Sequence, residues 1–568
     1  MQLVRLGWFS LLSTLSLTIS ATSQVAGGGY DKRFAWYGDA DGDLVGHCVA
    51  GVGDVDGDGW RDVLLGMPGV DGPAGALNPN RGRAELRSGQ TGDVIYQYSG
   101  FSNFDKVGTA VCGVGDINGD TIDDFAVSSD ANGGEVNLLS GATGFLLLKL
   151  TAPAGATRFG DHLAAAGDVD GDAIPDVWVA APGSEFGGVV EVGAVYLMSG
   201  ADGSLIRGLG GVEAFDNFGR QICCPGDLDG DGISEIMVSA TGANPGGKEH
   251  AGSVFVYSGA SGSQLYRYDG ATRWDFYGWS IASPGDLDGD TVPDLMIGSI
   301  FETWNNRMDV GIVSIYSGAT GLLIRDHPGT DGSELFGAAI CGIGDMNEDG
   351  IADYAIGSDG TAFGGQVTLW SGADGHRLFD VESETWNEHF GAELTSVGDL
   401  NGNGKVEFMV GAHSTTMNNV KGGAAYLYEF NPFMTVNSFT IDASAGATIS
   451  LDMQFPTTYL YEDKLFYQLV ISTSGTTYGS AFGLPNPLVS DYLFDLTSNG
   501  IYPGPFFDAK GELDANGQAR TKLVLGSDDA NPYIGMTFSF SCAFWEQPTF
   551  GETIFRGFAR PASVQVVP

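Results

Sequence analysis

Short apolar runs recur along the first three-quarters of the chain, and each follows a stretch rich in Asp and Gly. Apolar residues at consecutive positions are typical of a strand that is buried on both faces, and the repeats show no helical period. The pattern therefore predicts an all-β fold. The runs are VLL from Val63, FAV from Phe125, VWV from Val177, IMV from Ile236, LMI from Leu295, YAI from Tyr354 and FMV from Phe408.

Residues 432–568 follow a different pattern. Apolar and polar side chains alternate from Ala447 to Phe455 and again from Met536 to Phe544. Such alternation predicts half-buried strands. We therefore expect a small antiparallel β-sandwich in this part of the chain.

The stretches before the apolar runs are near-copies of one loop. The first copy is GDVDGDGWRD from Gly53, and six more follow at intervals of about 57 residues. A repeat of this length fits one four-stranded blade, and seven blades close a ring without an open edge. We therefore predict a seven-bladed β-propeller over residues 34–430, with all the loops on one face. A linear β-solenoid is the alternative, although its repeats are usually shorter and need end caps.

The loops begin like EF-hand calcium loops but do not continue as such. An EF-hand requires a bidentate Glu at position 12, whereas position 12 is apolar in all seven copies. An acidic residue stands at position 9 instead. Acids at positions 1, 3, 5 and 9, with a backbone carbonyl at position 7, can supply the six to eight oxygens that Ca²⁺ takes. Zinc would require His or Cys, and the loops contain neither.

We therefore expect Ca²⁺ in up to seven loops. The predicted ligands, loop by loop, are Asp54, Asp56, Asp58, Trp60 and Asp62; Asp116, Asn118, Asp120, Ile122 and Asp124; Asp168, Asp170, Asp172, Ile174 and Asp176; Asp227, Asp229, Asp231, Ile233 and Glu235; Asp286, Asp288, Asp290, Val292 and Asp294; Asp345, Asn347, Asp349, Ile351 and Asp353; and Asp399, Asn401, Asn403, Lys405 and Glu407. In the seventh loop two Asn replace acids and Lys405 adds a positive charge, so a turn without metal is the alternative interpretation of this loop.

An aromatic-Gly pair precedes five of the loops, as in Phe159-Gly160 and Phe218-Gly219, and a Gly-x-Pro element follows the first at Gly66-Met67-Pro68. Together with the D-x-D-G-D-x-x-x-D loop, these elements resemble FG-GAP repeats. The resemblance implies the seven-bladed propeller of integrin alpha chains and of many exported bacterial proteins. The first two copies depart from the pattern because they lack a clean aromatic-Gly pair.

The N-terminus predicts export. Arg5 precedes an apolar stretch from Leu6 to Ile19, and small residues follow up to Ser23. We interpret residues 1–23 as a secretory signal peptide, with a buried first helix as the alternative, and expect a secreted or cell-surface protein. No later apolar stretch is long enough for a transmembrane anchor. The net charge of −45 argues against nucleic acid as a partner.

Two further features look like sites but are interpreted as structural. Cys112, Cys223 and Cys341 occupy one repeat position that holds Ala or Thr in the other copies, so we predict free thiols in a slot for small residues. The acidic run Asp39-Ala-Asp41-Gly-Asp43 is out of phase with the loops, and we predict a solvated turn there.

The sequence favours a non-enzymatic interaction or adhesion module over an enzyme. The seven His residues do not recur in phase or cluster with a Ser or Cys nucleophile, and the partner is expected to be an extracellular protein or glycan. The alternative is a carbohydrate-active propeller, either a polysaccharide lyase or a lectin. Aromatic residues clustered with Arg or Lys at one propeller mouth would favour this alternative, and the candidates are Trp274, Tyr277, Trp304 and Trp386.

Overall fold

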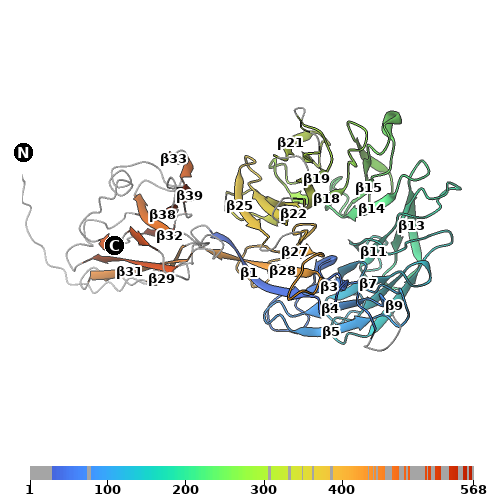
Figure 1. Cartoon of the computed structure of the whole chain (residues 1–568), viewed down its shortest axis with the longest axis horizontal. Coiled ribbons are helices and arrows are strands. Elements are labelled where there is room, and N and C mark those ends of the chain that lie inside the picture. The colour runs from blue at the N-terminus through green and yellow to red at the C-terminus, as the bar shows by residue number, and fades with distance from the viewer. Residues whose placement is uncertain are drawn as a thin grey trace, which may run out of the picture. The chain divides into compact units, whose positions relative to one another are not determined.

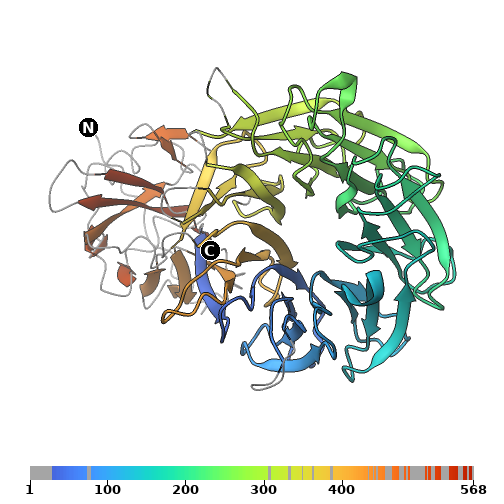
Figure 2. The same cartoon turned by 45° about the vertical axis from the view of Figure 1, so that its right-hand side comes forward.

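Seven four-stranded antiparallel sheets follow one another around a ring in the computed structural model (Figure 1). The structure describes residues 28–432 apart from 73–78, 305–306, 308, 331–333, 348, 361–363 and 384–387, and beyond residue 432 it describes the strands given below. The predicted seven-bladed propeller is confirmed, and the solenoid alternative is wrong. Figure 2 shows the succession of blades from a second direction.

Each blade begins with its innermost strand, and the next three strands follow outwards. Blade 1 is β2 (Cys48–Gly51), β3 (Val63–Met67), β4 (Arg83–Arg87) and β5 (Val94–Ser99). Blade 2 is β6 (Val111–Gly115), β7 (Asp124–Ser129), β8 (Glu135–Leu139) and β9 (Leu146–Thr151). Blade 3 is β10 (Leu163–Gly167), β11 (Asp176–Ala181), β12 (Ala194–Met198) and β13 (Leu205–Gly210). Blade 4 is β14 (Phe218–Cys223), β15 (Ile236–Ala240), β16 (Ser253–Tyr257) and β17 (Gln264–Asp269).

Blade 5 is β18 (Ser280–Gly285), β19 (Asp294–Ser299), β20 (Ile312–Tyr316) and β21 (Leu323–Pro328). Blade 6 is β22 (Phe336–Gly344), β23 (Asp353–Ser358), β24 (Gln366–Trp370) and β25 (Arg377–Glu382). Blade 7 is β26 (Glu393–Gly398), β27 (Glu407–Ala412), β28 (Ala424–Pro432) and β1 (Gly28–Tyr37). Two 3-10 turns, η1 (Ala131–Gly133) and η2 (Pro245–Gly247), lie in loops. Across the described residues, no helix has the length and apolarity that crossing a membrane requires.

The apolar runs form the second strand of each blade, as predicted. Every residue of β3, β7, β11, β15, β19, β23 and β27 is buried. Their side chains pack between neighbouring blades; Leu64 of β3 and Phe125 of β7, for example, belong to one buried cluster. Each such side chain contributes about 1.5–3 kcal/mol when it is fully buried, so the contacts between blades stabilise the ring.

The seventh blade takes its outermost strand from the N-terminal end of the chain. Strand β1 pairs with β28, and Arg33 Nη1 lies 2.5 Å from Glu429 Oε2. The Trp36 ring is buried in the cluster between blades 7 and 1, and its Nε1 donates to the carbonyl of Gly92 at 3.1 Å. The repeat pattern did not predict this strand, because β1 lies before the first copy of the repeat.

Antiparallel pairing within each blade puts the loops on two opposite faces of the ring. The loops between first and second strands lie on the same face as the turns between third and fourth strands. The loops between blades lie on the other face, with those between second and third strands. All seven acidic loops join a first strand to a second, so they share one face as predicted.

The described cysteines are free thiols. Cys48, Cys112, Cys223 and Cys224 are half-buried, Cys341 is buried, and none forms a disulfide. Burial raises the pKa of Cys112 and Cys223 to about 11 and that of Cys341 to about 12, so these thiols stay neutral. The prediction of free thiols is confirmed for Cys112, Cys223 and Cys341, and Cys48 and Cys224 are free as well. The side chain of Cys542 lies outside the described residues.

The contacts divide the chain into a unit over Lys32–Glu429 and a second unit that includes Phe430–Pro568. In the second unit β31 (Gly446–Gln454) pairs with β29 (Met434–Ser438), β30 (Ile441–Asp442) and β37 (Gln518–Leu525), and β37 pairs with β35 (Phe506–Phe507). Strand β38 (Thr537–Gln547) pairs with β32 (Lys464–Ser472), β39 (Ile554–Phe558) and β40 (Ala562–Gln565), and β32 pairs with β36 (Lys510–Glu512). Strand β33 (Gly479–Ala481) pairs with β34 (Leu484–Asn486). Packing of these sheets into a sandwich stays a prediction, and the predicted signal peptide lies outside the described residues.

Candidate metal sites and a charged pocket on the opposite face

The first acid of each loop fixes the turn through backbone hydrogen bonds. In the first loop Asp54 Oδ1 accepts from the backbone N–H groups of Gly57 at 2.8 Å and Asp58 at 3.1 Å, and Oδ2 accepts from Gly59 at 2.9 Å. The other loops repeat this pattern, for instance at Asp168 and Asp227. The first acid therefore both folds the turn and directs its charge towards the loop centre.

Four loops bring acidic oxygens together. Within each of these clusters the candidate ligand atoms lie within 4.8 Å of one another. These are loops 1, 3, 4 and 5, the four copies in which the sequence has acids at positions 1, 3, 5 and 9. The clusters are Asp54, Asp56 and Asp58; Asp168, Asp170 and Asp176; Asp227, Asp229, Asp231 and Glu235; and Asp286, Asp288 and Asp290.

The acid at position 9 is fully buried in all seven loops. In the first loop Asp62 Oδ2 accepts from the backbone N–H of Val55 at 2.8 Å, and Oδ1 accepts from that of Gly89 at 3.1 Å. Gly89 belongs to the SG-x-x-G turn between β4 and β5. The position-9 acid thus ties the loop to this turn, which explains why the two motifs recur in phase.

Burial and neighbouring acids disfavour the charged form of these carboxyls. They raise the pKa of Asp62 and Asp294 to about 6, and that of Glu235 and Asp353 to about 7, with burial as the main cause. A cation among the acids would reverse this effect. Magnesium fits less well than calcium, because it demands octahedral geometry and retains waters.

The fourth loop shows that the residues present fit a cation. Glu235 Oε2 accepts from the backbone N–H of Leu228, but Oε1 is buried without a hydrogen-bond partner. This oxygen belongs to the residue that completes the four-acid cluster. A buried carboxylate oxygen without a donor is costly, and a hard cation that takes oxygen ligands would satisfy it.

The seventh loop differs from the others in both charge and contacts. Asn401 Nδ2 donates to Glu429 Oε1 at 3.0 Å, so this side chain serves the contact with β28. Lys405 reaches the sixth loop, where its Nζ donates to the carbonyls of Asp345 at 3.0 Å and Met346 at 3.3 Å. The lysine therefore stabilises a contact between loops, and the loop retains only two acids.

The acidic run before the first loop is a turn, as predicted, but it is not wholly solvated. Asp39 and Asp41 are exposed, whereas Asp43 is buried and its Oδ2 accepts from the backbone N–H groups of Asp39 and Ala40, both at 2.9 Å. Asp105 and Asp216 close the equivalent turns before blades 2 and 4 in the same way. This acid belongs to the repeat and has a structural role.

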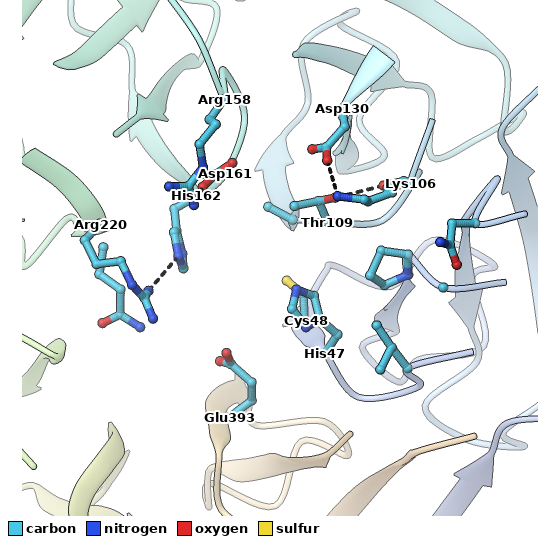
Figure 3. A pocket seen from close by; sticks show the side chains of 16 residues that line it. His47, Cys48, Lys106, Thr109, Asp130, Arg158, Asp161, His162, Arg220 and Glu393 are labelled. Carbon is cyan, nitrogen blue, oxygen red and sulfur yellow. Dashed lines mark hydrogen bonds and ion pairs between the residues drawn. The ribbon is translucent and has the colours of Figure 1, made fainter. Parts of the chain in front are cut away.

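A pocket of about 520 Å³ opens on the face opposite the acidic loops (Figure 3). Its walls come from the loops that lead into the blades and from the first residues of the inner strands. His47, Cys48, His162, Arg220 and Glu393 all line it. Two histidines and a cysteine therefore share one pocket, which the spacing along the sequence did not predict. Burial nevertheless raises the pKa of the Cys48 thiol to about 12, which leaves no reactive thiolate.

The sequence carries a signal for this pocket that its repeats obscure. The lining residues stand one or two positions after the aromatic-Gly pair: Asp161 and His162 after Phe159-Gly160, Arg220 and Gln221 after Phe218-Gly219, and Glu393 after Phe390-Gly391. In the first two copies Val45-Gly46 and Val107-Gly108 take the place of the pair. The residue before the pair has a positive φ in every copy: Leu44 60°, Lys106 46°, Arg158 59°, Asn217 55°, Phe276 52°, Leu335 53° and His389 56°.

Aromatic side chains gather on this face beside the pocket. Arg220 lies 5.0 Å from the Trp279 ring centroid, and Phe276 is 6.3 Å from Trp279 and 6.0 Å from Trp274. Trp274 is 45% exposed and stacks on His250 at 4.6 Å. This meets the condition set above for a carbohydrate-active propeller. Of the other candidates, Tyr277 is buried and hydrogen-bonded to Tyr316, Trp304 is 37% exposed, and Trp386 lies outside the described residues.

Comparisons with known proteins agree with the repeats and the ring. Residues 223–257 match the FG-GAP repeat. Integrin alpha-V of Gallus gallus is 31% identical over 288 residues, which cover 46% of this chain and 27% of the integrin. Integrin alpha-5 of Xenopus laevis is 32% identical over 206 residues, or 33% of this chain and 19% of that protein. The phosphatidylinositol-glycan-specific phospholipase D of Bos taurus is 31% identical over 179 residues, or 29% of this chain and 21% of the enzyme.

The matched part of the chain spans about a quarter of these relatives or less, so the similarity concerns their repeats and not their whole length. The FG-GAP match covers the end of β14, the fourth acidic loop, β15 and β16. The seven copies in the sequence extend the same pattern around the ring. The chain therefore contains an FG-GAP repeat, and its seven-bladed propeller resembles that of integrin alpha chains.

Proposed function

We propose that this protein is a secreted or cell-surface β-propeller that binds Ca²⁺ in its acidic loops and acts as a non-enzymatic interaction or adhesion module. The fourth loop carries the proposal, because the carboxylates of four acidic residues converge there, the largest such cluster among the described residues. The likeness to integrin alpha chains supports a role in adhesion. The partner is an extracellular protein or glycan.

Calcium should stabilise the folded ring by mass action, because the unfolded chain does not hold the acids together. At a free calcium concentration 100 times the Kd, one site adds about 2.7 kcal/mol to the free energy of unfolding. Several sites should raise the melting temperature by about 10 °C or more. Thermal melting with calcium, with the same concentration of magnesium and with chelator measures this effect. An unchanged midpoint in chelator contradicts the calcium sites.

Two matched substitutions test which loops hold the ion. Asp286 accepts backbone N–H groups from Gly289 and Thr291, and Asp399 accepts them from Asn403 and Gly404. Asp286→Ala and Asp399→Ala therefore remove similar turn contacts. Only the fifth loop forms an acidic cluster among the described residues of the two loops. Asp286→Ala should lose more calcium-dependent stability than Asp399→Ala, and equal losses would contradict the assignment.

Glycan binding is the second candidate function, and the aromatic group around Trp274 with Arg220 beside it favours this function. Binding of calcium-loaded protein to parallel arrays of glycans and extracellular proteins distinguishes the two partner classes. Binding to array proteins alone would contradict the glycan candidate, and binding to glycans alone would contradict a protein partner.

A further inference from the structure

The pocket on the face opposite the acidic loops contains an arginine without a carboxylate partner. The other two cations that line the pocket are already paired: Lys106 Nζ lies 2.7 Å from Asp130 Oδ2, and Arg158 pairs with Asp161. Arg220 donates to His162 Nε2 at 3.4 Å and stacks on Trp279, but it forms no ion pair among the described residues (Figure 3). The chain has 71 acidic residues and 26 Lys and Arg residues, so a half-buried arginine without a carboxylate partner is unexpected.

The carboxyls of Glu393 and Asp161 favour the charged form of Arg220, but neither forms an ion pair with it among the described residues. Burial and the nearby cations lower the pKa of His162 to about 3, so this imidazole is neutral and accepts a hydrogen bond from the guanidinium. Burial lowers the pKa of His47 as well. An anion that enters the pocket thus meets one cation that is ready to form two parallel hydrogen bonds, as guanidinium does with carboxylate.

The opposite wall favours hydroxyl groups and disfavours a second anion. Glu393 points into the pocket from the start of β26, facing Arg220 and His162 across the cavity (Figure 3). No hydrogen bond or ion pair occupies its carboxyl among the described residues. This group would repel a second carboxylate but would accept hydrogen bonds from hydroxyls. A suitable ligand therefore combines one anionic group with several hydroxyl groups.

Aromatic rings continue from Arg220 towards solvent. Trp279 lies under the guanidinium, and Phe276 and the exposed Trp274 follow at centroid distances of 6.3 and 6.0 Å. Aromatic rings can present an apolar face to a ligand while polar groups fix its orientation. The pocket volume of about 520 Å³ lies within the range of small-ligand sites.

We propose that this pocket binds an acidic saccharide, with a uronate carboxylate on Arg220, sugar hydroxyls on Glu393, and a neighbouring sugar ring against Phe276 and Trp274. The site is separate from the calcium loops and does not depend on them for its ligand contacts. It extends the proposed module by naming a ligand class, and its failure would leave the calcium sites untouched.

The test is calorimetric titration of the calcium-loaded full chain with uronate trisaccharides built from galacturonate, glucuronate or mannuronate. Each has a matched probe in which the carboxyl groups are reduced to alcohols. We expect at least one acidic trisaccharide to bind at least tenfold more tightly than its reduced form. If every acidic probe binds no better than its reduced form, the proposal is wrong.

Variants locate the binding. Arg220→Gln should weaken binding of the acidic trisaccharide at least tenfold and abolish its preference over the reduced form. Arg220→Lys keeps the positive charge but not the planar guanidinium, so this variant should lose less affinity. Trp274→Ala should weaken both probes several-fold. Arg158→Gln is the matched control, because this arginine lines the same pocket but is ion-paired. Calcium-dependent melting verifies that each variant folds.

An acidic peptide rich in Asp and Glu serves as a competing probe. If it binds through Arg220 while no uronate does, the pocket is a protein-docking site and the proposal is wrong. Loss of affinity in Arg158→Gln equal to that in Arg220→Gln would likewise contradict the assignment of the carboxylate to Arg220.

Discussion

The buried carboxyls of this propeller differ in what compensates their burial. Asp62, at position 9 of the first loop, receives backbone N–H donors both from its loop, at Val55, and from the neighbouring turn, at Gly89. Burial disfavours the charged form of Glu393, whereas the positive charge of Arg220 favours it. Burial is the larger effect, so the pKa of Glu393 rises to about 7. The folded protein therefore binds a proton at Glu393 more tightly than the unfolded chain does.

The pKa of Glu393 predicts a dependence of stability on pH. Because the folded pKa lies above the ordinary value of 4.5, the free energy of unfolding should fall as pH rises from about 4.5 to about 7. Glu393→Gln removes this cost. We expect the variant to match wild type near pH 4.5 and to exceed it by about 1–2 kcal/mol at pH 8, after allowance for solvent screening.

Urea unfolding at several pH values, with calcium saturating for both proteins, measures the difference. Glu249→Gln is the control, because Glu249 is half-exposed and paired with Arg273 at the surface, so this substitution should change the free energy of unfolding little. A Glu393→Gln difference that does not change with pH would show that the carboxyl is not desolvated.

Among the strands, β1 has a role that no other strand shares. It fills the outermost position of blade 7 and brings Trp36 into the cluster between blades 7 and 1. Trp36→Ala should cost about 3–5 kcal/mol in the free energy of unfolding, because it removes a large buried ring and its hydrogen bond to Gly92. Phe101→Ala is the control, since Phe101 is 81% exposed. Equal midpoints for the two variants in urea would mean that β1 contributes little to closure.

The strands that could be predicted are those that every copy needs for folding. The buried second strands and the position-9 acids repeat with little change, because the same contact between blades and the same loop recur seven times. Strand β1 occurs once, so repetition could not reveal it. The pocket residues His47, His162 and Arg220 differ between copies because folding does not require them, and only the ring brings them together.

Across the whole molecule, the acidic loops lie in a circle on one face of the ring, and several neighbours touch. A side-chain carbon on Gly226 of loop 4 would lie 3.0 Å from Pro293 of loop 5, and one on Gly285 would lie 3.1 Å from Ala352 of loop 6. Arg61 of loop 1 donates its backbone N–H to the carbonyl of Leu400 in loop 7 at 3.0 Å. Loops 4, 5 and 6, and loops 7 and 1, are therefore in direct contact, whereas a side-chain carbon on Gly167 of loop 3 would meet nothing within 4 Å.

This circle predicts coupling between adjacent loops only. Asp227→Ala and Asp286→Ala alter neighbouring loops, and their losses of calcium-dependent stability should deviate from additivity by at least about 0.5 kcal/mol. Asp54→Ala and Asp286→Ala alter loops in blades 1 and 5, which do not adjoin in the ring, and these losses should add. Double-mutant cycles with and without calcium measure both pairs. Additivity in both would show that the ions bind independently.

Because β1 pairs with β28, blade 7 cannot be completed until β28 has been synthesised. Arg33 and Glu429, which pair across the closing sheet, are 396 residues apart, so β1 must wait during synthesis for nearly the last strand of the propeller. At about 5–20 residues per second, that wait is on the order of 20–80 s. During this time the first blades can form while the edge of β1 stays without its partner. A chain that terminates before β28 leaves the ring open, so completion of blade 7 is a checkpoint for the whole propeller.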